Sequence, residues 1–354
     1  YYGDYLALDK ILGAQKLQST KYGEPAHEEM LFIVVHQVYE LWFKQLLHEL
    51  NAVIDTFNQA AVKDQQLTSV VHRLHRVIQI QKLMNDQIGI METMTPQQFL
   101  SFRDYLVPAS GFQSIQFKQL EISLGLKREY RIDFDKQSFY NRLSDDDRSL
   151  LEALEEKPSL FELVDKWLAR MPLLKTEDFH FWDYYRKATD EMLNDDKETI
   201  EKNAFLSEVE RRQELKDWQS TKENFNGIFN HDTYEALLKQ GKFRLSHEAL
   251  LSALFIKQYS EEPVFNLPFQ LITALTEIDE QLTLWRYRHA MMVQRMLGTK
   301  IGTGGSSGHH YLKKTTESNR VFLDFFNMAT FLLPKSSLPE LPESVKRRLG
   351  FYLQ

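Results

Sequence analysis

The spacing of apolar residues follows a helical period over most of the chain. Residues 31–57 place apolar side chains on one broad face, with polar positions such as Gln37 and His48 between them. The same pattern predicts a second long helix over about residues 69–92. No stretch alternates apolar and polar residues with a period of two between turn residues, so we predict an all-α fold.

Residues typical of helix ends place further elements. Thr95, Pro96 and Gln98 form a capping-box pattern, which predicts a helix that ends at Pro108. Further along the chain, Ser246 is the expected N-cap of a helix through residue 259.

Two more signals predict one helix after each of these two elements. Ser110 and Gln113 repeat the capping-box pattern, so a helix is expected directly after Ser110. A long helix is expected from about Pro268, ended by Gly298 in the position that favours glycine.

The middle of the chain differs from both ends in its charge. Runs such as SDDDRS and NDDKETIEKN are typical of solvated helix faces. We interpret about 127–240 as a peripheral helical insertion that begins with an irregular stretch, within a single all-α domain spanning residues 1–354.

Composition excludes several classes of protein. Hydrophobic residues make up 43% and charged residues 26%, which is ordinary for a globular protein with a sizeable core. A net charge of −7 does not favour binding to nucleic acid, which is itself negatively charged. The densest apolar run, LFIVV, is far shorter than a membrane span, and no secretion signal is recognisable, so a cytoplasmic location is expected.

The absence of cysteine removes disulfides, thiolate nucleophiles and zinc fingers. Any metal must therefore be bound by other side chains or arrive within a cofactor. Glu24 and His27 have the spacing of a di-iron motif but lack a second such pair, and His72 and His75 lack a carboxylate to complete a site.

Two histidines lie within apolar helix stripes. His289 is centred in a stripe that includes Trp285 and Met292, which fits either an axial haem ligand or a core histidine with its hydrogen bonds satisfied. Arg286 and Arg288 flank it as haem propionate partners would, although surface arginines are common. His36 lies in an aromatic stripe, where a flat ligand could stack or the core could simply pack.

Two further features suggest recognition of a small polar molecule. Arg103 shares a helix face with Phe99 and Leu106, so it could bind a carboxylate, or it could pair with an acid such as Asp104 or Glu121. The loop GTGGSSG lacks the lysine and the preceding strand of a phosphate-binding loop. It is therefore either a lid over a ligand or a plain linker.

Long segments of the chain resemble the tryptophan 2,3-dioxygenase family. They include YGDYLALDKIL, HEEMLFIVVHQVYELWFKQLLHEL, MTPQQFLSFRDYLVPASGFQSIQFKQLE and WRYRHAMMVQRMLGTKIGTGGSSGHHYL. The resemblance runs from Tyr2 to about Glu121 and from about Leu245 to Phe331, while the charged middle is similar only loosely.

The resemblance implies a haem b enzyme, with ferrous iron in its active form. It would insert both atoms of O2 across the indole C2–C3 bond of L-tryptophan to give N-formylkynurenine, the first step of the kynurenine route. By position, the residues expected to bind substrate are Phe32, His36, Phe99, Arg103, Leu106, Thr303, Tyr2 and Tyr5. Those expected to bind the cofactor are His289 as the iron ligand, Trp285, Ser110 and Tyr311.

Within this resemblance, His36 is the catalytic residue and accepts a hydrogen bond from the indole N–H. Members of the family are homotetramers, so Tyr2 and Tyr5 would reach a neighbouring subunit's site. The residues agree with this chemistry, because one Arg, one hydroxyl and stacked aromatics suit a zwitterion with a flat apolar body. A broader indoleamine dioxygenase and a helical scaffold without cofactor are the alternatives.

Overall fold

The computed structural model describes residues 1–131, 143–170, 181–298 and 308–342. Helices and short 3-10 turns are the only regular elements within these ranges, so the predicted all-α fold class is confirmed. The longer α-helices are α3 (His27–Phe57), α4 (Asp64–Met91), α6 (Ile115–Leu124), α8 (Asp145–Glu155), α9 (Leu160–Ala169), α10 (Phe181–Lys202), α11 (Glu208–Phe229), α12 (His231–Lys239), α13 (His247–Gln258), α14 (Asn266–Leu297) and α15 (Gly308–Ser318). The short ones are α1 (Tyr2–Leu6), α2 (Leu8–Leu12), α5 (Pro96–Leu100) and α16 (Leu323–Asn327).

The contacts divide the chain into two compact units. Unit 1 comprises residues 1–59, 72–161 and 277–321, and unit 2 comprises residues 60–71, 162–276 and 322–354. A separate inserted subdomain over about 127–240 stays a prediction. Within the described residues, no helix is long and apolar enough to cross a membrane.

Three of the predicted helix ends are confirmed. The Thr95 hydroxyl accepts a hydrogen bond from the backbone N–H of Gln98, whose own side chain accepts one from the N–H of Thr95. Ser246 caps α13 through the N–H of Ala249. Gly298 follows α14 with a φ of 58°, a left-handed conformation that glycine adopts without the strain of a Cβ atom.

Two predicted helices are shorter than expected. After Leu100 the backbone tightens into 3-10 bonding, and the Ser101 hydroxyl bonds the Gln98 carbonyl, which competes with helical continuation. The 3-10 turn η2 (Arg103–Leu106) follows, so Arg103 does not lie on a helix with Phe99.

The next helix begins later than Ser110, because Ser114 is its N-cap. The Ser114 hydroxyl accepts a hydrogen bond from the backbone N–H of Phe117, and α6 starts at Ile115. The Ser110 N–H bonds the side chain of Gln113, but the residues between them form only the 3-10 turn η3 (Gly111–Gln113).

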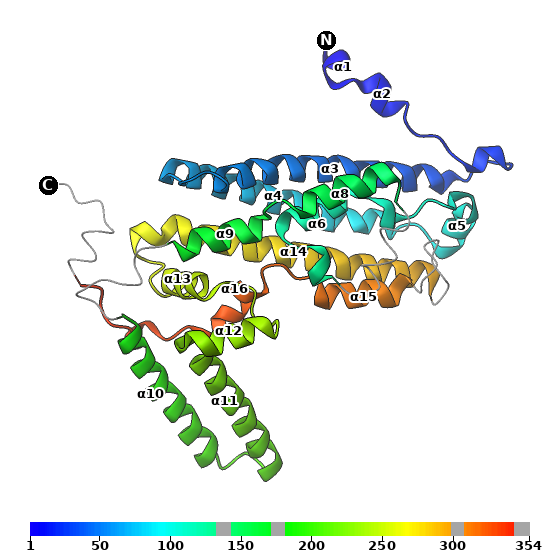
Figure 1. Ribbon diagram of the computed structural model, residues 1–354. Helices are drawn as coiled ribbons and strands as arrows, with labels where there is room; N and C mark the ends of the chain where they lie inside the picture. The colour runs from blue at the N-terminus through cyan, green and yellow to red at the C-terminus, as the bar shows by residue number, and fades with distance from the viewer. Residues whose placement is uncertain (132–142, 171–180, 299–307, 343–354) are drawn as a thin grey trace. The chain divides into compact units, whose positions relative to one another are not determined.

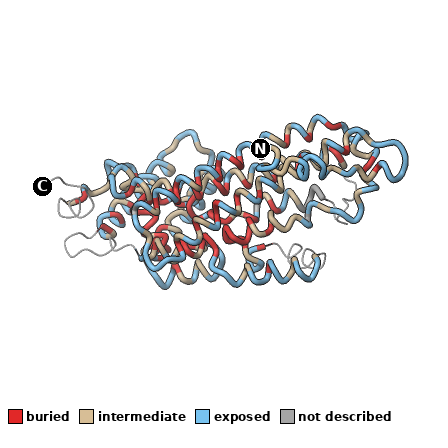
Figure 2. Tube along the Cα trace, turned by 90° about the horizontal axis from the view of Figure 1, so that it is seen from above, coloured by how far each residue is buried: buried red, intermediate tan, exposed pale blue. Residues whose placement is uncertain are grey.

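Unit 1 is built mainly from α3, the residue 72–91 part of α4, α6 and the residue 277–297 part of α14, which run alongside one another (Figure 1). Buried segments alternate with exposed ones along the long helices in Figure 2, as one-sided packing requires. Helices α4 and α14 are also joined by polar contacts, in which Gln81 donates to the Ile278 carbonyl and Asn85 to the Gln281 carbonyl.

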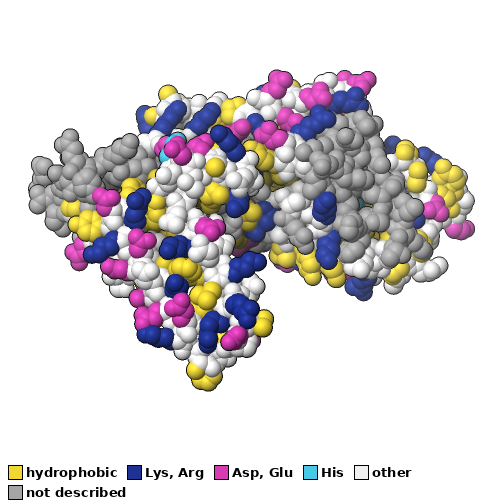
Figure 3. All heavy atoms as spheres, turned by 60° about the horizontal axis from the view of Figure 1, so that its bottom comes forward, with side chains coloured by type: hydrophobic (Ala, Val, Ile, Leu, Met, Phe, Trp, Pro, Cys, Tyr) yellow, Lys and Arg dark blue, Asp and Glu magenta, His cyan; other side chains and the backbone are white. Residues whose placement is uncertain are grey.

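Unit 2 contains the charged helices α10 and α11, whereas charged α8 belongs to unit 1. Helices α10 and α11 form a hairpin (Figure 1), in which the Trp218 indole N–H donates to the carbonyl of Leu193. Basic and acidic side chains are interspersed on the face of this hairpin seen in Figure 3, and several pair one turn apart, as Lys197 and Glu201 do. These charged side chains face solvent.

Candidate functional site

Unit 1 brings the two candidate histidines together from separate helices. His36 lies on α3 and His289 on α14, and the two imidazoles are close enough that His36 helps to lower the pKa of His289. Burial is the larger cause, and it brings the pKa of His289 to about 4. Both rings therefore belong to one site, and His289 is neutral at pH 7.

The hydrogen bonding of His36 fixes which of its nitrogens is open. Its Nδ1 lies 2.7 Å from the carbonyl oxygen of Phe32, one turn earlier on α3. A carbonyl oxygen can only accept, so Nδ1 carries the proton and Nε2 keeps its lone pair. Burial, the largest influence, lowers the pKa of the ring, although its side chain still presents accessible surface. His36 is therefore a neutral imidazole with an accessible side chain.

His289 has an apolar setting without hydrogen-bond partners. Its Nδ1 is buried, and neither ring nitrogen bonds to a described residue. Its ring stacks on that of Trp285, with centroids 5.1 Å apart and planes inclined by 14°. Nδ1 is one of several buried polar side-chain atoms without a partner among the described residues, so the His289 ring is not committed to a structural hydrogen bond there. This arrangement fits an axial haem ligand, which must offer a neutral imidazole nitrogen.

Aromatic side chains extend the wall beside Trp285. The ring of Phe117 from α6 lies 5.1 Å from the Trp285 ring, and Tyr39 and Phe43 from α3 meet it edge-on. The Tyr39 hydroxyl donates to the Met84 carbonyl, and burial raises its pKa to about 12, so it remains protonated. Flat apolar walls of this kind suit a planar macrocycle.

The predicted indole wall residues come together in one cluster. Phe32, Phe99 and Leu106 pack around the buried side chains of Val35 and Phe102. The rings of Phe32 and Phe99 lie 5.9 Å apart, and Phe32 also contacts the His36 ring at 4.1 Å. The cluster therefore adjoins His36, although its residues come from α3, α5 and η2.

The predicted polar contacts with substrate are described only in part. Arg103 is partly buried at the start of η2, directly after the fully buried Phe102. Thr303 lies outside the described residues. Tyr311 lies on α15, but its side chain is not among those described, and Ser110 immediately precedes η3.

The predicted trans residues Tyr2 and Tyr5 lie on α1 and are exposed. Among the described residues, no group of three or more histidine and carboxylate side chains could hold a metal ion.

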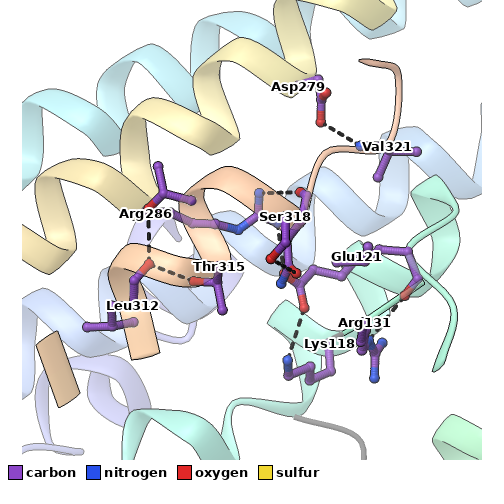
Figure 4. Close-up of polar contacts among 12 residues, drawn as sticks. Lys118, Glu121, Arg131, Asp279, Arg286, Leu312, Thr315, Ser318 and Val321 are labelled. Carbon is purple, nitrogen blue, oxygen red and sulfur yellow. Dashed lines mark hydrogen bonds and ion pairs between the residues drawn. The ribbon is translucent and has the colours of Figure 1, made fainter. Parts of the chain in front are cut away.

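The sequence did not indicate the buried ion cluster, defined here as Lys118, Glu121 and Arg286 (Figure 4). Arg286 donates to the Glu121 carboxylate at 2.8 Å and to the Asn319 carbonyl at 2.8 Å, and Lys118 lies 3.1 Å from the same carboxylate. The pKa of Glu121 falls to about 2, because these cations outweigh the effect of burial. Arg286 is thus committed to an internal partner instead of a propionate. The only sequence signal for this cluster was the presence of Glu121 and Arg286 within apolar stretches of their helices.

A second unforeseen contact ties α3 to the start of α6. The Glu40 carboxylate accepts hydrogen bonds from the Ser114 hydroxyl at 2.6 Å and the Gln116 amide at 2.8 Å. Glu40 lies one helical turn after His36, so this contact holds the α6 aromatic wall against the helix that carries His36.

Comparison with known proteins matches this chain to one family. The family model described as Tryptophan 2,3-dioxygenase matches residues 1–332. A tryptophan 2,3-dioxygenase of Alteromonas mediterranea is 83% identical over 354 residues, which is 100% of this chain and 98% of the relative. Relatives of the same name from Bdellovibrio bacteriovorus and Dictyostelium discoideum are 44% and 46% identical, cover 99% of this chain, and are themselves covered to 98% and 88%. The chain belongs to the tryptophan 2,3-dioxygenase family.

Proposed function

We propose that this chain is a haem-dependent dioxygenase that inserts both atoms of O2 across the indole C2–C3 bond of L-tryptophan to give N-formylkynurenine. The observation that carries the proposal is the pairing of two histidines: within the part of the chain that the structure describes, neutral His289 has no hydrogen-bond partner and the Nε2 of His36 has none either. Membership of the family supports the reaction, and the aromatic walls support both a planar cofactor and a planar substrate.

His289 would hold the iron of haem b, and Trp285 and Phe117 would line the macrocycle. When bound, ferrous haem supplies the O2 chemistry, and the protein supplies binding, orientation and electrostatics. Burial keeps the His289 imidazole neutral, so it can offer a lone pair without first losing a proton. Ser110 and Tyr311 would complete the cofactor site.

His36 would orient the substrate through one hydrogen bond. Because Nδ1 is committed to the Phe32 carbonyl, only Nε2 remains, and it can accept from the indole N–H. A neutral ring is required for this, and burial favours that state by lowering the pKa. His36 would thereby fix which edge of the indole faces the reacting oxygen.

The remaining substrate contacts would match a zwitterionic amino acid. Phe32, Phe99 and Leu106 would enclose the indole and exclude water, and the planar guanidinium of Arg103 suits a carboxylate. Thr303 would bind the ammonium and carboxylate groups. An indoleamine without a carboxylate would lose the Arg103 contact, which favours L-tryptophan over a broader indoleamine substrate range.

A homotetramer is the proposed assembly, with Tyr2 and Tyr5 completing a neighbouring subunit's site. Helices α1 and α2 bury no residue within their own chain, which supports a role against another subunit. Apolar aromatic side chains left in water are commonly covered by a partner.

An absorption spectrum tests the proposal directly. The protein is purified with haem supplied, reduced under CO, and measured with and without L-tryptophan. We expect a histidine-ligated haem band that shifts when L-tryptophan is added, together with formation of N-formylkynurenine in air. Haem binding without any response to tryptophan would refute the substrate, and failure to bind haem would favour a scaffold without cofactor.

A further inference from the structure

The first thirteen residues form an arm in which no residue is buried. Tyr2 and Tyr5 are 75% and 88% exposed, and Leu12 is 72% exposed. In Figure 1 the arm, made of α1 and α2, stands away from α3. Exposed apolar side chains of this kind are commonly covered by another molecule.

A buried carboxylate attaches the segment that follows the arm to helix α3 of the same chain. Glu29 lies in the first turn of α3 with 0% of its surface exposed. One of its carboxylate oxygens accepts the backbone N–H of Gln18 at 2.7 Å, and the other accepts that of Ser19 at 3.0 Å. Both oxygens are thus used by the segment that follows the arm.

Neighbouring contacts extend this attachment along α3. The Ser19 hydroxyl accepts the N–H of Ala26, and Gln37 bonds both the Gln15 side chain, at 2.6 Å, and the Ala14 carbonyl. The attachment points Glu29 and Gln37 are eight residues apart, or roughly 12 Å of helix. Residues 14–19 therefore lie along α3, and the arm departs at Gly13.

The energetics of Glu29 indicate that its carboxylate serves this attachment. Burying a carboxylate is costly unless its charge is compensated, and none of the described lysines or arginines forms an ion pair with it. Two backbone N–H donors and the N-terminal end of the α3 dipole provide the compensation. An amide at this position could accept at only one atom, and its NH2 group would face a backbone donor.

We propose that Glu29 is a positioning residue that acts on the active site of a neighbouring subunit. By holding residues 18 and 19, it fixes where and in which direction the arm leaves, so that Tyr2 and Tyr5 are delivered to the neighbour. The inference rests on the proposed trans contact of the arm.

The expected size of the effect follows from the length of the tether. With the attachment in place, about nine residues separate Tyr5 from the first fixed point at Ala14. If the contacts of Glu29 and Gln37 are both lost, the next fixed point is the start of α3 at Ala26, so the tether grows to about 21 residues. Effective concentration falls with roughly the −3/2 power of length, which predicts a loss of about threefold or more.

Mixed oligomers allow the chain that supplies the arm and the chain whose active site receives it to be mutated separately. A donor chain carries His289→Ala, so its own site is inactive but its arm is intact. An acceptor chain lacks residues 1–5, so it can turn over only with an arm from a donor. The two chains are co-expressed with different tags, with donor in excess, purified through both tags, and assayed for turnover of L-tryptophan per bound haem.

We expect Glu29→Gln combined with Gln37→Leu in the donor chain to lower turnover about threefold or more, and the same two changes in the acceptor chain to leave it unaltered. Glu28→Gln in the donor is the matched control, because Glu28 lies in the same turn but contacts Gln98 instead of the arm. Gln37→Leu in the donor should give a smaller loss with the same asymmetry, which keeps the test available if Glu29→Gln does not fold.

Two other outcomes overturn the inference. A loss confined to the acceptor chain, or equal in both chains, would assign Glu29 to the stability of its own subunit. If unaltered donor chains do not restore activity to acceptor chains at all, the trans contact itself is wrong and the inference fails with it. That second result is read from the unsubstituted pair, so the two failures are distinguishable.

Discussion

Two groups of titratable side chains include residues of α14 that lie one turn apart. One is the buried ion cluster around Arg286 and the other is the pair of His36 and His289, and the two differ in how far their polar atoms are hydrogen-bonded. Arg286 and Glu121 are almost fully buried, and both ends of the guanidinium bond to protein acceptors. Only three residues along the same helix, His289 has no hydrogen-bond partner among the described residues, and His36 keeps one nitrogen open. The saturated cluster joins helices α6 and α14, whereas the pair His36 and His289 is the proposed ligand site.

The largest effect is expected at this pair of histidines. His289→Ala removes the only proposed iron ligand, so the purified protein should retain no stoichiometric haem. Haem absorbance per protein after gel filtration measures this. His48→Ala, at an exposed histidine on α3, is the control and should retain haem. A normal histidine-ligated spectrum in His289→Ala would remove the axial assignment.

The saturated cluster should respond in stability instead of cofactor content. Glu121→Gln leaves the buried Arg286 and Lys118 without their counter-charge, and breaking a buried pair in this way costs about 3–5 kcal/mol of unfolding free energy. Chemical denaturation of the holoprotein measures the loss, with Glu277→Gln at the half-exposed pair with Lys82 as the matched control.

The pH dependence of stability gives a second test of the Glu121→Gln variant. The folded pKa of Glu121 is about 2 against an ordinary 4.5, so its contribution is complete above pH 4.5 and is lost as pH falls from 4.5 toward 2. The stability difference between wild type and Glu121→Gln should shrink across that window. A difference independent of pH would contradict the assignment.

Helix ends were predictable from the sequence where the signal is local. The Thr95 capping box, the Ser246 cap and Gly298 each act through atoms within a few residues, so spacing alone suffices. Ser110 and Ser114 offer competing local signals, and only Ser114, whose hydroxyl also bonds Glu40 74 residues away, begins an α-helix. The capping-box pattern at Ser110 did not show which serine would be used, because it carries no information on such long-range contacts.

The same limit applies to the site. His36 and His289 were identifiable because each interrupts an apolar stripe on its own helix. The partner of Arg286 was not, because Glu121 lies 165 positions earlier and on another helix. The tautomer of His36 could not be predicted from the sequence either. Its partner Phe32 is only one turn away, but the hydrogen bond depends on the orientation of the His36 side chain.

A smaller effect is expected from the guanidinium beside the indole cluster. Arg103→Ala should remove a charge-assisted contact with the substrate carboxylate, which is worth about 1.5–3 kcal/mol. The KM for L-tryptophan should therefore rise by roughly ten- to 150-fold with haem content unchanged. Tryptamine lacks the carboxylate, so it is the matched probe, and its turnover should be nearly indifferent to the change. Unaltered saturation with L-tryptophan would refute the role of Arg103.

The smallest effect is expected at His36, because one neutral hydrogen bond is worth about 0.5–1.5 kcal/mol. His36→Ala should lower kcat/KM for L-tryptophan by roughly two- to twelvefold and leave haem in place. The sharper measurement uses an analogue methylated at the indole nitrogen, which cannot donate to Nε2. Wild type should discriminate against this analogue, and His36→Ala should lose much of the discrimination. Complete inactivity of the variant, with haem and L-tryptophan still bound, would instead mean that His36 does more than position the indole.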